Sequence, residues 1–127
     1  MISEQLSFLP DSLPDFHPFP PARERTVWNA LPQRVKDRFL KAGEAALAAT
    51  IAPLPLSLWL DFSHTGRRTA WEDAYFSRRA RLCALVCAEC VEHTGRFLDA
   101  IADTVWALCE ESAWQLPAHN SYIRDTP

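Results

Sequence analysis

The sequence predicts an all-α protein, and three observations support that prediction. Apolar residues recur at helical spacing in the long segments 33–50, 70–93 and 97–113. No segment shows the strict apolar–polar alternation of a half-buried strand. Glycine accounts for only 3 of the 127 residues, so few of the tight turns that join neighbouring strands are expected.

Composition and charge narrow the class of protein. The chain is 48% hydrophobic and 23% charged, as in a single globular domain. A net charge of −3 argues against nucleic-acid binding through bulk charge. The N-terminus lacks the basic and apolar regions of a signal peptide, and no apolar stretch has the length to span a bilayer. We therefore expect a cytoplasmic protein without membrane partners, whose 4 cysteines are thiols.

The N-terminal residues 1–21 form a proline-punctuated segment. Proline fixes φ and lacks an amide donor, so no long helix is expected there. An extended arm with Phe16 and Phe19 as aromatic anchors is predicted for 1–21, followed by one helical domain over 22–127. A short helix is expected over 22–30, ending at Leu31-Pro32.

In the middle of the chain, the secondary structure is predicted from the prolines and the glycine that interrupt helices. The segment 33–50 reads as a helix that the prolines of 52–56 end. Residues 57–62 read equally as a short extended piece or a helical turn, and 64–68 as a turn because of its glycine.

The longest predicted helix is 70–93, and its second half, "LCALVCAECV", is apolar nearly all round. Such a helix is usually surrounded by other helices. Gly95 suits the left-handed residue that ends a helix. The last helix, 97–113, should pack antiparallel to it through one apolar stripe. The stripe comprises Phe97, Ile101, Val105, Leu108 and Cys109.

The spacing of Cys83, Cys87 and Cys90, C-x3-C-x2-C, matches the cluster ligands of radical enzymes that use S-adenosylmethionine. Here the three thiols lie on one face of an apolar helix, where small apolar side chains let helices approach closely. We therefore interpret them as core residues and expect no metal and no cofactor. A zinc site completed by Cys109 is the alternative, although thiolates along one helix rarely converge on a tetrahedron.

Charged residues in the helices have two interpretations each. Glu89 is alone in the apolar run, so we expect an arginine partner, or else a position facing a cleft. The arginines of 67–81 either pair with Glu72 or Asp73 on a solvated face or recognise an anionic ligand. The structural interpretation is favoured in both cases.

Near the C-terminus, "SAWQLPAHNSY" gathers side chains that hold polar ligands by stacking and hydrogen bonds. The candidate substrate-binding residues are Trp114, His119, Asn120 and Tyr122. A purely structural loop is the alternative. No Ser-His-Asp set, phosphate-binding loop or His-rich metal motif is present, so no residue is assigned a catalytic role.

The segment Arg78–Tyr122 resembles the N-terminal part of bacterial heparinase II/III-like proteins. It matches three of their recurring motifs: "R-x-R-L…A-E-C-V-E", "G-R-F-L-D-x-I…W-x-x-C-E-E" and "W-x-x-P-A-H-N". "LWLDFSHTGRR", Leu58 to Arg68, resembles the segment before them, so that the likeness covers about 22–127.

The resemblance implies a fold and an activity. The family carries an α/α toroid, an incomplete ring of helical hairpins, followed by β-sandwich domains. Its active members are polysaccharide lyases, which cleave glycosaminoglycan-like or other uronic-acid polymers by β-elimination. In these enzymes an Asn or His neutralises the uronate carboxylate, and a Tyr or His moves the proton.

The expected function follows from that likeness. The family's catalytic Asn or His and Tyr lie later in the toroid, so this chain is expected to be an inactive N-terminal fragment whose full-length protein binds an acidic polysaccharide. Its matched loop, with Trp114, His119 and Asn120, should face the substrate cleft. The alternative is a stand-alone helical interaction module that self-associates through apolar helix faces.

Overall fold

The computed structural model describes residues 18–120, apart from the side chain of Asn120, and every regular element in this range is a helix. The helices are α2 (Arg25–Asn29), α3 (Gln33–Ala48), α4 (Leu56–Thr65), α5 (Thr69–Glu92), α6 (Leu98–Cys109) and α7 (Pro117–Asn120). The all-α prediction is confirmed. Of the predicted arm, residues 1–17 with Phe16 lie outside the described residues, and Phe19 is 76% exposed. No helix that the structure describes is long and apolar enough to cross a membrane.

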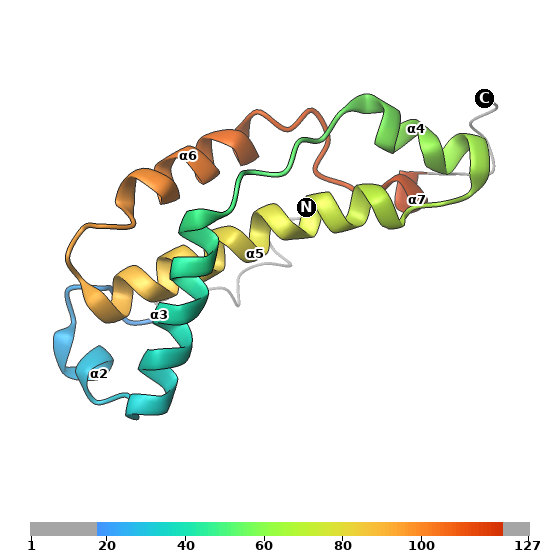
Figure 1. Cartoon of the computed structure of the whole chain (residues 1–127). Coiled ribbons are helices and arrows are strands. Elements are labelled where there is room, and N and C mark those ends of the chain that lie inside the picture. The colour runs from blue at the N-terminus through green and yellow to red at the C-terminus, as the bar shows by residue number, and fades with distance from the viewer. Residues whose placement is uncertain (1–17, 121–127) are drawn as a thin grey trace, which may run out of the picture.

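Helix α5 is the central element, and α2, α3, α4 and α6 all contact it. Figure 1 shows α6 running back along α5 in the opposite direction, as the sequence predicts, while α3 crosses the C-terminal half of α5. At the other end of α5, α4 contacts the short helix α7. The segment 110–116 joins α6 to α7 and follows α5 toward its N-terminal end.

The small core lies where α3, α5 and the start of α6 meet. Ala46, Leu85, Ala88 and Phe97 are its buried members, and Phe97 and Leu85 are fully buried. Gly43 allows α3 to approach α5 closely, because a Cβ at this position would overlap Ala88 Cβ and lie 3.3 Å from the Phe97 ring. This close approach brings the Phe97 ring under α3.

The turn between α5 and α6 has two residues with positive φ, His93 at 58° and Gly95 at 84°. Helix α5 therefore ends near the predicted position, but His93, and not Gly95, is its left-handed C-cap. Glu89 stabilises the turn, because its carboxylate accepts hydrogen bonds from the backbone N–H of Gly95 at 2.7 Å and of Phe97 at 3.2 Å. The expectation that Glu89 pairs with an arginine is wrong, because two backbone N–H groups donate hydrogen bonds to its buried carboxylate instead.

The buried face of α6 overlaps the predicted stripe only in part. Phe97 is buried and Ile101 is half-buried, but Val105 is 42% exposed and Cys109 is exposed. Fully buried Thr104 takes the inward position that the prediction gave to Val105. Its hydroxyl donates to the Ala100 carbonyl at 2.6 Å and accepts from Arg81 Nε at 3.1 Å, so the buried hydroxyl is satisfied.

Local signals explain the ends of α4 and α7. The segment 57–62, which the sequence left open between a strand and a helical turn, lies inside the helix α4. Pro55 precedes this helix, and Gly66 ends it with φ of 75°. Helix α7 was not predicted; it begins at Pro117, a favourable first residue because its missing amide donor is not needed there.

The cysteines are less buried than predicted. Cys83 is exposed, whereas Cys87 and Cys90 are half-buried, and the three thiols line an apolar groove of about 530 Å³ beside residues 19–22 and Trp28. Burial raises the pKa of the Cys87 and Cys90 thiols, with a smaller contribution from the neighbouring cysteine in each case. Among the described residues, no three His, Cys, Asp or Glu side chains are placed to hold one metal ion.

Candidate functional site

The candidate site lies where the chain leaves α6 and crosses α5, and Glu111 is the residue that holds it together. Its carboxylate, only 2% exposed, contacts Arg78 Nη1 at 3.2 Å and Arg79 Nη2 at 2.7 Å. Two guanidinium groups compensate the desolvation of one buried carboxylate, and their planar geometry fixes its orientation. The segment after α6 is therefore bound firmly to α5.

Tyr75 makes the second attachment, one helical turn earlier on α5. Its hydroxyl donates to the Trp114 carbonyl at 3.0 Å, and the Arg79 guanidinium lies 3.2 Å from its ring centroid. The same guanidinium donates to Glu111, so Tyr75, Arg79 and Glu111 form one connected set. This set fixes the backbone at the beginning of the predicted ligand loop.

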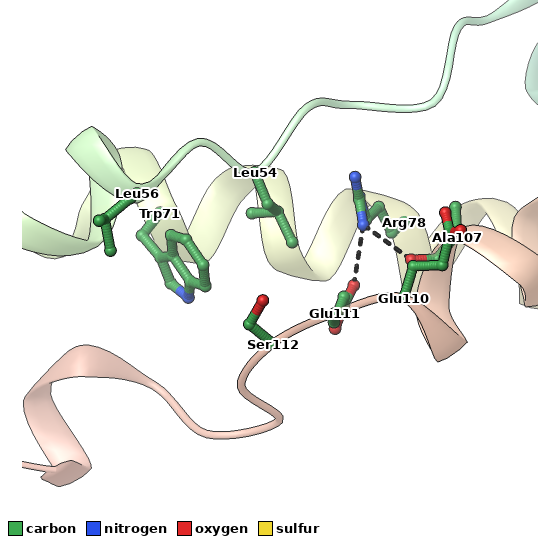
Figure 2. Close-up of a pocket in the computed structure, with 8 residues that line it drawn as sticks. All are labelled: Leu54, Leu56, Trp71, Arg78, Ala107, Glu110, Glu111 and Ser112. Atoms are coloured by element: carbon green, nitrogen blue, oxygen red, sulfur yellow. Dashed lines mark hydrogen bonds and ion pairs between the residues drawn. The ribbon is translucent and has the colours of Figure 1, made fainter.

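A pocket of about 310 Å³ opens next to these attachments, between the segment before α4, the helix α5 and the end of α6 (Figure 2). Its size is at the low end of the range for small-ligand pockets. The lining residues are Leu54, Leu56, Trp71, Arg78, Ala107, Glu110, Glu111 and Ser112.

Trp71 is the most distinctive residue of the pocket. Its side chain packs edge-on against Trp59, with ring centroids 5.0 Å apart, and the residue is only 6% exposed. Its indole Nε1 donates no hydrogen bond to any described residue. Figure 2 shows this nitrogen on the side of the ring that faces Ser112. Since a buried N–H without an acceptor is costly, the pocket is suited to a ligand or water that supplies an acceptor.

The arginines in this region already have partners in the protein. Arg78 Nε donates to the Ala52 carbonyl at 2.6 Å and its Nη1 to the Ala107 carbonyl at 3.1 Å, in addition to its contact with Glu111. Arg81 donates to carbonyls of Ala46 and Ala49. Arg68 pairs with Glu72 at 3.4 Å, as the structural interpretation expected. Hydrogen-bonding side chains and apolar walls therefore define the pocket, and it has no free cationic cluster among the described residues.

The predicted site residues lie beyond this pocket. Trp114 is 68% exposed and His119 is exposed, and neither lines the pocket. The side chain of Asn120 and all of Tyr122 lie outside the described residues. The structure thus fixes the backbone of the loop at Trp114, through Tyr75, and leaves the Trp114 side chain accessible.

Sequence reasoning missed the residues that line and support the pocket, chiefly Trp71, Tyr75 and Glu111. A signal for two of them was present. Trp71 and Tyr75 are four residues apart and therefore share one face of α5, and Arg78 follows on that face. Two aromatic rings and an arginine on one helix face were therefore the signal that the sequence contained.

No protein-family model matches the chain, and the search of curated proteins also finds no match.

Proposed function

We propose that this chain forms part of the helical domain of a heparinase II/III-like polysaccharide lyase, and that its pocket and the adjoining segment 112–120 bind acidic polysaccharide. The observation that carries the proposal is positional. The pocket contains the buried indole N–H of Trp71, which has no acceptor among the described residues. Its lining includes Ser112, which precedes the motif "W-x-x-P-A-H-N" by two residues in the chain. The all-helical fold is compatible with an α/α toroid.

The chemistry of the pocket suits a sugar ring. Sugar hydroxyl oxygens accept hydrogen bonds from an indole N–H, and sugar hydroxyls donate to carboxylates such as Glu110. The side chains of Leu54 and Leu56 offer apolar contact for the C–H groups of a ring. The 68% exposed ring of Trp114 supplies a stacking surface just outside the pocket.

Binding, and not cleavage, is the activity proposed for these residues. The resemblance assigns neutralisation of the uronate carboxylate to an Asn or His and the proton transfers to a Tyr or His. These catalytic residues lie outside the matched motifs, so the chain alone is expected to release no unsaturated product. Ultraviolet absorbance of the new double bond measures that product directly. Its release by this chain, purified to homogeneity, would contradict the assignment.

The binding proposal is tested by calorimetric titration with size-defined uronic-acid oligosaccharides. We expect Trp114→Ala and Trp71→Phe each to weaken binding, by about 5- to 30-fold for the loss of one stacking or hydrogen-bond contact of about 1–2 kcal/mol. Trp106→Ala is the matched control, because Trp106 is 69% exposed on α6 and does not line the pocket. Equal effects of Trp106→Ala and Trp114→Ala, or no binding of any oligosaccharide to the unmodified chain, would contradict the proposal.

A second candidate function, a helical association module, is favoured by a separate observation. Helix α6 exposes Leu98 by 54%, Val105 by 42% and Trp106 by 69%. Large apolar side chains gathered on one helix face are typical of an interaction surface.

A further inference from the structure

The outward face of α6 carries a continuous apolar stripe. Its members follow one another at intervals of four, three, one and three residues, which places them on one side of a helix with about 100° between residues. The stripe, named here the α6 stripe, comprises Leu98, Ala102, Val105, Trp106 and Cys109, all exposed. Because the opposite side of α6 already packs on α5, this helix is apolar on two faces.

An acidic edge borders the α6 stripe along one side. Asp99, Asp103 and Glu110 are exposed and lie next to Trp106 on the helix surface, at the same angular spacing. None of these three carboxylates forms an ion pair with a described residue. A partner that covers the stripe would therefore meet three unpaired negative charges.

Helix α3 carries a groove in which cations outnumber carboxylates. A shallow groove of about 540 Å³ runs along its outward side and is lined by Arg34, Asp37, Arg38, Lys41, Ala42 and Ala45. Asp37 accepts a hydrogen bond from Gln33 at 2.8 Å, whereas the three cations have no carboxylate partner among the described residues. The alanines and the aliphatic stems of the cations provide apolar contact. This surface is named here the α3 groove.

We propose that the α6 stripe of one copy of this chain docks into the α3 groove of a second copy. The proposal rests on the second candidate function, association through helix faces, and adds its partner and its two surfaces. Charge complementarity selects this occupant: the acidic edge faces the three cations when the stripe enters the groove. Trp106 then lies against the stems of Arg38 and Lys41, where its ring also gains cation–π attraction.

The two surfaces are separate within one molecule. Both α3 and α6 pack on α5 through their other sides, and Arg81 fixes them by bonding the Ala49 carbonyl and the Thr104 hydroxyl. The contact is therefore made between different surfaces of two copies. Because the interface is one helix wide, we expect a weak association that depends on concentration and on salt.

Charge exchange provides the first test. One variant, Arg38→Glu with Lys41→Glu, has two acidic surfaces; the other, Asp99→Lys with Asp103→Lys, has two basic ones. We expect light scattering after size exclusion to show association of the unmodified chain that rises with concentration and falls with added salt. Each variant alone should stay monomeric at concentrations at which the unmodified chain associates. An equimolar mixture should associate again, at a concentration at least 10-fold below any at which either variant alone associates.

The outcomes separate this inference from the candidate function beneath it. If the unmodified chain is monomeric at every concentration, both are wrong. If it associates but the mixed variants do not recover association, the chain is an association module and the proposed pair of surfaces is wrong. Circular dichroism of each variant checks that the exposed substitutions leave the helices intact, and a reducing agent excludes disulfide-linked species.

A tryptophan comparison gives an independent second test. Trp106→Ala is expected to weaken self-association at least 10-fold, whereas Trp114→Ala, at a residue of nearly equal exposure outside both surfaces, should leave it unchanged. This is the reverse of the pattern expected for polysaccharide binding. Equal effects of the two substitutions on association would overturn the assignment of the α6 stripe.

Discussion

At the scale of single residues, Gly43 shows why a position in the middle of a helix can be restricted to glycine. In an isolated helix, alanine would be favoured over glycine by about 1 kcal/mol. In this fold, a Cβ on Gly43 would overlap Ala88 Cβ and would lie only 3.3 Å from the Phe97 ring. Both neighbours are buried, so neither can move into solvent.

We therefore expect Gly43→Ala to destabilise the protein by about 1–2 kcal/mol, because overpacking outweighs the gain in helix propensity. Adding Ala88→Gly removes the overlapping atom and should restore part of the loss. Urea unfolding of the single and double variants measures both effects. A single variant as stable as the unmodified chain would contradict the close approach of α3 and α5.

At the scale of helices, arginines bind the carbonyl groups that helix ends leave without partners. Arg25 donates to the Cys90 and Val91 carbonyls at 2.6 and 2.9 Å at the end of α5. Arg78 donates to Ala107 near the end of α6, and Arg81 to Ala46 and Ala49 at the end of α3. Each guanidinium thus satisfies carbonyl groups and joins two segments distant in sequence.

Arg81→Ala is expected to lower the free energy of unfolding by about 2–3 kcal/mol, because it leaves carbonyls of α3 and the buried Thr104 hydroxyl with fewer hydrogen-bond partners. Arg81→Lys should recover only part of this, since one ammonium group cannot span the acceptors on both helices. Arg23→Ala is the control, at an exposed arginine whose side chain bonds no described residue. Thermal unfolding compares the three variants, and equal melting temperatures for Arg81→Ala and Arg23→Ala would contradict this role.

The end of α5 also has a charge pair that depends on pH. The Glu92 carboxylate accepts two hydrogen bonds from Arg96, at 2.7 and 2.8 Å, and one from the Thr94 hydroxyl at 2.7 Å. The Arg96 hydrogen bonds, followed by that of Thr94, lower the pKa of Glu92 to about 2. The Glu92 and Glu44 carboxylates in turn raise the pKa of Arg96.

A lowered pKa stabilises the folded state only while the carboxylate is ionised. The contribution of Glu92 is therefore complete above its unfolded pKa of about 4.3 and is lost as the pH falls toward 2. Glu92→Gln should be less stable than the unmodified chain at neutral pH and low salt, and the difference should vanish toward pH 2. Asp73→Asn, at an exposed carboxylate with no ion pair among the described residues, should show no such convergence. Urea unfolding across that pH range measures both differences.

At the scale of the whole molecule, α5 supports two separate packing centres. Leu85 and Ala88 belong to the core with α3 and Phe97, whereas Trp71 and Tyr75 pack with α4 and the segment after α6. The first centre determines the position of α6, and the second forms the pocket. The α6 stripe belongs to neither centre, which is why it is available for the proposed contact between copies.

Sequence patterns predicted α2, α3, α5 and α6, left α4 open between two interpretations, missed α7, and predicted the site only in part. Trp114 and His119 were singled out because their loop gathers ligand-binding residue types, and their accessible positions keep that interpretation testable. The pocket behind the loop was not predicted, because Leu54, Trp71 and Glu111 come from three segments. No local pattern records which distant segments will meet.

The sequence by itself predicted the long helices α3, α5 and α6 and carried the signals at the ends of α4, because proline and left-handed residues act through the local backbone. Pro55 precedes α4 and Gly66 ends it for this reason. Only the tertiary structure decided the full extent of the buried side of α6, since that helix is apolar on two faces and the stripe predicted from its periodicity included both buried Phe97 and exposed Val105. The Phe97 ring under Gly43 and the Arg81–Thr104 hydrogen bond made that choice. They require α3 and α5 to be already packed together.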